Sequence, residues 1–317
     1  MRIVHGIDAL PLEEQSSVVT VGFFDGVHLG HRAVFEATVN GARARSMRSV
    51  GITFDRHPRE VLAPGTEPRL LTTVERKAAL IASSGLDVLV VLEFTHAFSR
   101  ITAEDFVRDV LVGGVHARHA VMGANFTFGF KAMGTVETLP SMGAPFDMTA
   151  EGVPLVELGG RTVSSSSIRL ALAAGDLTWP VEGLGRTFAL DGEVVSGHGR
   201  GKGLGYPTAN LLTRPRLLLP GQGIYAGVAE VRGRRYRAAI DVGTNPTFGV
   251  EPLHVEAFLL DYDEGEIRGE PVAIELWERL RDEEWYPSVD ELVVAIADDV
   301  DRTRDLVPDD ALTRSDP

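Results

Sequence analysis

The sequence predicts an α/β protein of two domains: an N-terminal domain with a parallel sheet and a small β insertion, and a C-terminal antiparallel β-barrel with a terminal helix. Three observations predict this fold class. Short apolar runs alternate with helical patterns over the first half of the chain, as in βαβ units. Alternating strand patterns separated by turn residues then fill about ninety residues. The length of 317 residues suits two domains of about 150 residues each.

The first half of the chain contains four predicted strands and the helices that connect them. The strands are expected at residues 18–24, 49–55, 87–93 and 120–123, and the helices at 31–47, 74–84 and from Thr102 onward. Gly85 ends the second of these helices. Connections of this kind are right-handed and give a parallel sheet. Ligands of such sheets bind at the carboxyl ends of the strands, where the segment Asp25–His31 falls.

From about residue 130 the alternation of strand and helix patterns stops. Residues 130–161 are punctuated by glycine and proline and are expected to form the β insertion. Serines at Ser164–Ser167 can cap a helix that Gly175 ends. The strands of an antiparallel sheet or small barrel follow, and residues 289–306 are expected to form an amphipathic terminal helix. The predicted domains are 1–182 and 183–306, with a disordered tail at 307–317.

The composition excludes several classes of protein. Lys plus Arg number 31 and Asp plus Glu 45, so the formal net charge is 31 − 45 = −14, which argues against a general nucleic-acid binder. The absence of cysteine excludes disulfides, thiolate metal sites and cysteine nucleophiles. No apolar run has the length of a signal peptide or a membrane span. We expect a cytoplasmic protein without nucleic-acid or membrane partners, as a monomer or weak homo-oligomer.

The strongest N-terminal signal is Gly22–His31, GFFDGVHLGH, directly after the first predicted strand. Its glycines let the backbone approach a phosphate closely, and the amides that open the next helix point toward an anion. The imidazoles of His28 and His31 can donate to the same phosphate oxygens. One alternative is a metal-binding pair, for which no third ligand is obvious. The other is a plain strand–turn–helix with chance histidines.

This segment is similar to the HxGH nucleotidyltransferase superfamily, which has a Rossmann-like fold, and its exact form resembles the bacterial bifunctional riboflavin kinase/FMN adenylyltransferase (FAD synthetase) family. Thr53–Pro58, Gly123–Gly129 and Val163–Arg169 extend the resemblance, with Arg56 and Ser166 as departures from the family pattern. The resemblance implies an FMN adenylyltransferase domain in which His28 and His31 are catalytic. Its implied ATP and flavin site consists of Gly22, Phe24, Asp25, Gly26, Gly30, Asn125, Arg161, Ser164, Ser165 and Arg169.

The second domain contains five alternating glycines in Gly197–Leu211, GHGRGKGLGYPTANL. Alone, such a run is more often a flexible loop, but it leads into PTAN, which resembles the riboflavin kinase signature. The resemblance implies a loop over the ATP phosphates and a Mg²⁺ ion held by Thr208 and Asn210, since hard oxygen ligands suit magnesium. The implied ATP and flavin residues of the kinase are Gly197, Gly199, Gly201, Lys202, Gly203, Gly205, Pro207, Asn245 and Arg281.

Glu256 interrupts an apolar strand in the segment HVEAFLLD, where it shares a face with Phe258 and Leu260. Most glutamates in such a position are exposed acids on a strand edge. A partly buried carboxylate can instead take the proton from an incoming hydroxyl. The resemblance implies that Glu256 is the general base of the kinase.

The resemblance covers residues 18–306 and implies two reactions. The barrel phosphorylates riboflavin with ATP to give FMN, and the first domain transfers AMP from a second ATP to FMN, giving FAD and pyrophosphate. Departures at Ile267–Gly269 and Trp285–Ser288 lie where flavin-side loops are expected, so the flavin preference stays open. The alternatives are a family member with one activity lost or retuned to a flavin analogue, a non-catalytic flavin-binding regulator, and a different nucleotidyltransferase, which leaves PTAN unexplained.

Overall fold

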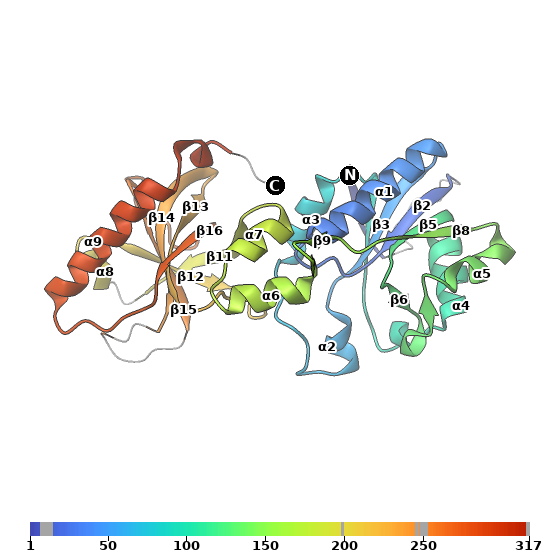
Figure 1. Cartoon of the computed structure of the whole chain (residues 1–317), viewed down its shortest axis with the longest axis horizontal. Coiled ribbons are helices and arrows are strands. Elements are labelled where there is room, and N and C mark those ends of the chain that lie inside the picture. The colour runs from blue at the N-terminus through green and yellow to red at the C-terminus, as the bar shows by residue number, and fades with distance from the viewer. Residues whose placement is uncertain (7–14, 198–199, 245–246, 248–252, 315–317) are drawn as a thin grey trace. The chain divides into compact units, whose positions relative to one another are not determined.

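The computed structural model describes residues 1–6, 15–197, 200–244, 247 and 253–314. The chain packs into two compact units. The first, which we call the α/β unit, comprises Met1–Pro68 and Val74–Ser165. The second, the barrel unit, comprises Arg69–Thr73 and Ser166–Asp316. In Figure 1 the α/β unit runs from blue to green and the barrel strands from yellow to orange.

A six-stranded parallel sheet forms the centre of the α/β unit, with the strand order β1-β4-β3-β2-β5-β8. The strands are β1 (Arg2–His5), β2 (Ser17–Val21), β3 (Arg48–Phe54), β4 (Val88–Leu92), β5 (Ala117–Gly123) and β8 (Thr149–Val153). The parallel sheet and its four predicted strands are confirmed. β8 lies inside the segment predicted as an insertion, and it escaped prediction because this edge strand has no fully buried residue.

Helices cover both faces of this sheet. They are α1 (Leu29–Ala44), α2 (Pro58–Leu62), α3 (Val74–Ala82), α4 (Ala103–Asp105) and α5 (Leu139–Gly143), and α4 continues as a π-helix over Phe106–Gly114. Leu111 of the π-helix packs in one core cluster with Val50 of β3. Phe35 of α1 and Ile81 of α3 pack in a second cluster with Leu89 of β4. The result is a three-layer arrangement with a core on each side of the sheet.

Two short antiparallel pairs lie around β8 in the sequence. β6 (Thr127–Phe128) pairs with β7 (Gly134–Thr135), and β9 (Glu157–Leu158) pairs with β10 (Arg161–Thr162). β7, β9 and α5 lie within residues 130–161, whose glycines and prolines predicted short extended pieces; β6 lies just before this segment and β10 at its end.

The barrel unit contains a closed antiparallel barrel with the strand order β11-β12-β15-β14-β13-β16, as predicted. The strands are β11 (Phe188–Val195), β12 (Thr208–Thr213), β13 (Gly223–Val231), β14 (Arg234–Gly243), β15 (His254–Leu259) and β16 (Pro271–Arg281). The helices α6 (Ser165–Ala173) and α7 (Thr178–Leu184) precede the barrel, and α8 (Arg200–Gly203) lies between β11 and β12. Packing groups α6 and α7 with the barrel unit, and the domain boundary at 182/183 stays a prediction.

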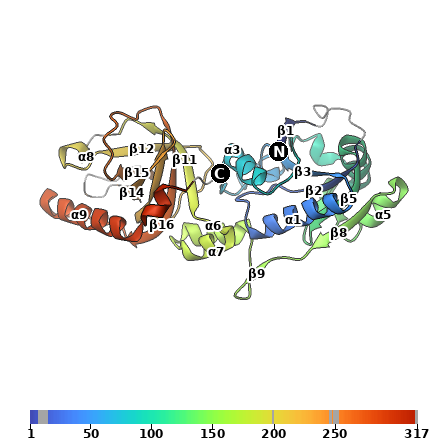
Figure 2. The same cartoon turned by 90° about the horizontal axis from the view of Figure 1, so that it is seen from above.

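The terminal helix α9 (Val289–Leu306) has the predicted bounds. Ser288 caps it by accepting a hydrogen bond from the backbone N–H of Glu291. Two acids occupy its first turn, where the helix dipole stabilises negative charge. Figure 2 shows α9 lying along the barrel strands.

The prediction of a disordered tail from residue 307 is wrong for the part that the structure describes. Val307 and Ala311 are buried, and a 3₁₀ turn spans Asp309–Leu312. Arg235 and Arg237 of β14 donate to the backbone carbonyls of Ala311 and Val307, respectively. These long-range partners hold the segment, and its own composition gives no sign of them.

Candidate active sites

The loop Gly22–His28, called the His28 loop below, follows β2 at the carboxyl end of the sheet. Phe24, Gly26 and Val27 have positive φ angles of 55°, 80° and 43°, a region that side chains disfavour. A Cβ at Gly22 would lie 2.5 Å from the ring of Phe24, so only glycine fits there. Backbone strain of this kind is typical of ligand-binding loops.

His28 and His31 lie at the start of α1. His28 is the N-cap residue, and the backbone N–H of His31 donates to its Nδ1 at 3.4 Å. The two rings stack with centroids 3.6 Å apart. Gly30 makes room for this stack, because a Cβ there would lie 3.1 Å from the His28 ring. Both imidazoles therefore lie at the N-terminus of a helix of 16 residues, where bound anions are stabilised.

The first residue of α6, Ser165, contacts the His28 loop. The hydroxyl of Ser165 donates to the backbone carbonyl of Asp25 at 3.0 Å, and the Asp25 side chain is buried. This bond joins two of the motifs that were predicted to hold one triphosphate. The other predicted residues of this site are Asn125, exposed after β5; Arg161, exposed in β10; Ser164, half-buried; and Arg169, which belongs to the barrel unit.

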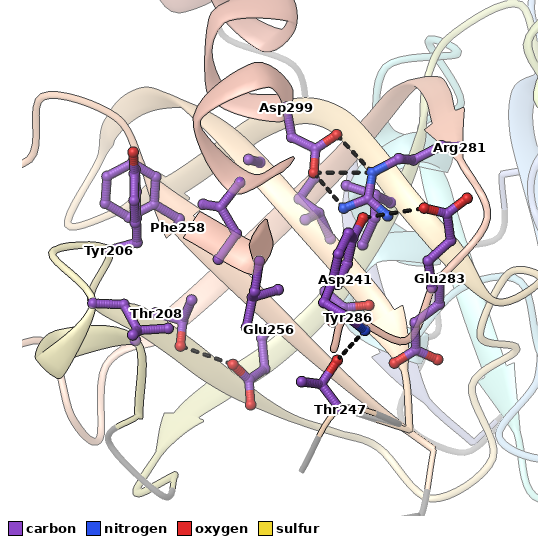
Figure 3. A pocket seen from close by; sticks show the side chains of 18 of the residues that line it. Tyr206, Thr208, Asp241, Thr247, Glu256, Phe258, Arg281, Glu283, Tyr286 and Asp299 are labelled. Atoms are coloured by element: carbon purple, nitrogen blue, oxygen red, sulfur yellow. Dashed lines mark hydrogen bonds and ion pairs between the residues drawn. The ribbon is translucent and has the colours of Figure 1, made fainter. Parts of the chain in front are cut away.

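The barrel unit holds a cavity of about 150 Å³, shown in Figure 3. The segment before β12, the strands β12, β14 and β15, the end of β16 and the helix α9 all contribute to its wall. Segments far apart in the sequence thus meet around one space. The predicted site residues in its wall are Gly201, Thr208, Asn210, Glu256 and Arg281.

Glu256 lies in the middle of β15, and its register partners are Asn210 on β12 and Asp241 on β14. Residues paired in register project from the same face of a sheet, so three polar side chains form a row across adjacent strands. Thr208 donates its hydroxyl to Glu256 Oε2 at 2.8 Å (Figure 3), and His254 Nε2 lies 3.4 Å from Oε1. The Glu256 side chain is 18% exposed, so it is the partly buried carboxylate of the functional prediction and not an exposed edge acid.

Asp241 is a residue of this cavity that sequence reasoning missed. Burial, together with the charges of Glu283 and Glu256, raises the pKa of its carboxyl to about 7. Its Oδ1 is buried and makes no hydrogen bond to any residue within the described ranges. One signal was available in the sequence, because Asp241 stands in an otherwise apolar run, AAIDVG.

Arg281 is held by α9. Its guanidinium pairs with both carboxylate oxygens of Asp299, at 3.0 Å from Nε and 2.7 Å from Nη2, and it lies over the ring of Tyr286 at 5.7 Å. Glu283 accepts from the backbone N–H of Thr244 at 3.0 Å. These contacts tie the end of β16 to α9 on one side and to the end of β14 on the other, which fixes one wall of the cavity.

Two glycines before β12 let the backbone pass close to Asn210 and Tyr206. A Cβ at Gly197 would lie 2.1 Å from the amide nitrogen of Asn210, and one at Gly201 would lie 2.2 Å from the carbonyl oxygen of Tyr206. Gly201 therefore requires glycine, because backbone atoms block a side chain there, whereas a side chain at Gly197 would displace the amide group of Asn210. Gly203, Gly205 and Pro207 are exposed. The predicted residues Gly199 and Asn245 lie outside the described residues, as does the side chain of Lys202.

Two family models match the sequence, FAD synthetase over residues 10–167 and riboflavin kinase over residues 184–307. The protein called bifunctional riboflavin kinase/FMN adenylyltransferase in Bacillus subtilis is 33% identical over 307 residues, which is 94% of this chain and 95% of that one. The protein of the same name in Pseudomonas fluorescens is also 33% identical over 307 residues, covering 96% and 98%. The chain belongs to the bifunctional riboflavin kinase/FMN adenylyltransferase family.

The family resemblance predicted from the HxGH and PTAN motifs is thereby confirmed. The FAD synthetase model lies on the α/β unit and the riboflavin kinase model on the barrel. A crystal structure described as a macrolide-efflux protein from Streptococcus pneumoniae is 30% identical, covers 97% of this chain and 100% of that one, and superposes with a TM-score of 0.86. Within the described part of this family member, no helix has the length and apolar character needed to cross a membrane.

Proposed function

We propose that the barrel unit transfers the γ-phosphate of ATP to riboflavin, giving FMN and ADP. The α/β unit then transfers AMP from a second ATP to FMN, giving FAD and pyrophosphate. The observation that carries this proposal is the Glu256 carboxylate, which is hydrogen-bonded to Thr208 in the wall of the barrel cavity. A protein that only binds flavin has no use for a base at this place. The names and coverage of the relatives support both activities.

Glu256 acts as the general base of the kinase. It takes the proton of the terminal ribityl hydroxyl while that oxygen forms its bond to the γ-phosphorus and ADP leaves. The hydrogen bond from Thr208 to Oε2 orients the carboxylate. Apolar residues of the same cavity, among them Ile240, Leu292 and Ile296, offer a surface for the flavin.

Thr208 and Asn210 fit a magnesium site. Both offer oxygen atoms on the first residues of β12, and Glu256 lies beside both of them. Magnesium prefers hard oxygen ligands and keeps waters and substrate phosphates as its other ligands. When bound, the ion offsets negative charge on the phosphate that is transferred.

In the adenylyltransferase no side chain becomes covalently modified. A phosphate oxygen of FMN attacks the α-phosphorus of ATP, and pyrophosphate leaves. His28 and His31, together with Ser165, hold the triphosphate and stabilise the charge that develops on it. Catalysis then comes from positioning and electrostatic stabilisation. The stacked imidazoles at the start of α1 and the bond between Ser165 and Asp25 support this assignment.

We further propose that the protein works in the cytoplasm on small molecules, without nucleic-acid or membrane partners, as a monomer or weak homo-oligomer. The net charge of −14 supports the absence of nucleic acid.

The test is to assay the two half reactions separately on one preparation. Riboflavin, ATP and Mg²⁺ should yield FMN and then FAD, and supplied FMN with ATP and Mg²⁺ should yield FAD. A chelator should stop both reactions, and added Mg²⁺ should restore them. Formation of only one product would mean that one site is inactive or retuned, and tight flavin binding without ATP consumption would identify a regulator.

A further inference from the structure

Lys77 on α3 is a buried cation to which the reactions above assign no role. Its side chain is 3% exposed. The ammonium donates to the backbone carbonyls of Phe23 and Phe54, each at 3.1 Å, and to Oγ1 of Thr53 at 3.2 Å. Phe23 belongs to the His28 loop, and Thr53 and Phe54 end β3. One charged group therefore joins the carboxyl ends of β2 and β3.

All three of these hydrogen bonds require the protonated amine. The hydroxyl of Thr53 donates to the carbonyl of Phe23 at 3.1 Å, so in this arrangement Thr53 Oγ1 accepts from Lys77. An ammonium has three hydrogens for the three acceptors, whereas a neutral amine has two hydrogens and a lone pair. Deprotonation removes one of the three N–H donors and the positive charge, and the amine keeps its contact with Thr53 only if that hydroxyl turns away from the carbonyl of Phe23. Loss of the proton therefore changes the hydrogen bonding that anchors Phe23.

The His28 loop depends on such anchoring. Phe24 and Val27 have positive φ angles, and conformations of this kind persist only when their surroundings hold them. Lys77 holds the loop at Phe23, through the carbonyl and through the ring, whose centroid is 4.3 Å from the ammonium. Ser165 holds it at Asp25, and His28 caps α1 at its end.

The protonation state of Lys77 changes close to neutral pH. Burial lowers the pKa of its ammonium to about 8, while the charges of Asp25 and Asp55 raise it. Asp55 is in turn paired with Arg56, and His57 contacts the ring of Phe23. Within the described residues, Asp25 of the His28 loop and Asp55 after β3 are the charged groups that act on the Lys77 ammonium.

We propose that Lys77 is a positioning residue for adenylyl transfer: its ammonium fixes the His28 loop, and loss of its proton suppresses FAD formation but leaves FMN formation unchanged. The proposal rests on adenylyl transfer by the α/β unit. Lys77 and all of its partners belong to that unit, so the kinase reaction of the same molecule serves as an internal control.

The experiment measures both half reactions of the full chain from pH 6 to pH 10. For the wild type, FAD formation from FMN should fall by about tenfold per pH unit above a midpoint near 8, as expected for one essential protonated group, and FMN formation should lack this limb. Lys77→Met should lower FAD formation by about 10-fold to 100-fold, the usual loss on small misplacement of a site, and should abolish the alkaline limb. Lys131→Met, at an exposed lysine of the same unit, is the matched control and should keep the wild-type profile.

The pH profile separates positioning from a merely structural role. A structural lysine would lower thermal stability when replaced and leave the alkaline limb in place. If the rate of FAD formation by the wild type does not change between pH 7 and pH 10, the inference is wrong. This test needs no variant, so it holds even if Lys77→Met does not fold. A folded Lys77→Met protein with the wild-type rate or limb overturns it as well. Absence of FAD formation at pH 7 in the wild type would instead overturn the proposed function itself.

Discussion

Replacing Asp241 by asparagine should stabilise the barrel unit in a pH-dependent manner. The pKa of this carboxyl rises from the ordinary 3.8 to about 7 in the folded protein, mainly because of burial and then because of Glu283 and Glu256. The unfolded chain releases its proton at a lower pH than the folded chain does. Stability therefore falls as the pH rises from about 4 to about 7, and the whole penalty is present above pH 7.

The size of this penalty follows from the shift. About three pKa units at about 1.4 kcal/mol each give an upper limit of about 4 kcal/mol. Asp241→Asn removes the ionisable group and keeps the shape of the side chain. The variant should therefore be more stable than the wild type at pH 8, by up to this amount, and should lose most of the advantage at pH 4.5.

Tryptophan fluorescence during urea unfolding measures this effect in the correct unit. The chain has three tryptophans, and Trp179, Trp277 and Trp285 all lie in the barrel unit. The two proteins should be compared at pH 4.5, 6 and 8 without ligands. A variant less stable than the wild type at pH 8, or a difference that does not change with pH, would refute the reasoning, because it would mean that the ionised carboxylate is satisfied in the folded state.

The other predictions concern the separation of the two sites. His28→Ala or His31→Ala should reduce FAD formation by about 100-fold to 1000-fold, as for other donors to developing charge, while FMN formation persists; equal loss of both in a folded variant would mean that the sites are not separate. Asn210→Ala and Thr208→Ala should each weaken the kinase and raise its requirement for Mg²⁺, because an oxygen ligand is removed. Full kinase activity of the Asn210 variant at limiting Mg²⁺ would exclude Asn210 as a ligand.

The sequence predicts those elements whose signals are local. β4 is an uninterrupted apolar run because both faces of a central parallel strand are buried, and α9 begins where Ser288 caps it. The His28 loop was predicted because its glycines and histidines are adjacent in the chain. Here local chemistry and tertiary structure agree.

The features that escaped prediction depend on partners far away in the sequence. β8 is identified only by its pairing with β5, and the tail after α9 is ordered by arginines on β14. The raised pKa of the Asp241 carboxyl depends on the pairing of β14 with β15, which places Asp241 opposite Glu256. In the sequence, Asp299 is one acid among several on an amphipathic helix, and its ion pair with Arg281 is visible only in the structure.

Glu256→Gln is the most direct test of the assignment of the kinase site. The substitution keeps the size of the side chain and its ability to accept from Thr208 Oγ1, but it removes the basic form. Riboflavin binding, measured on the same preparation, should change little, and FAD formation from supplied FMN should remain. FMN formation should fall by about two to four orders of magnitude, the usual contribution of general acid–base catalysis. Near-normal phosphorylation of riboflavin by the folded variant would contradict the assignment and remove Glu256 from the mechanism.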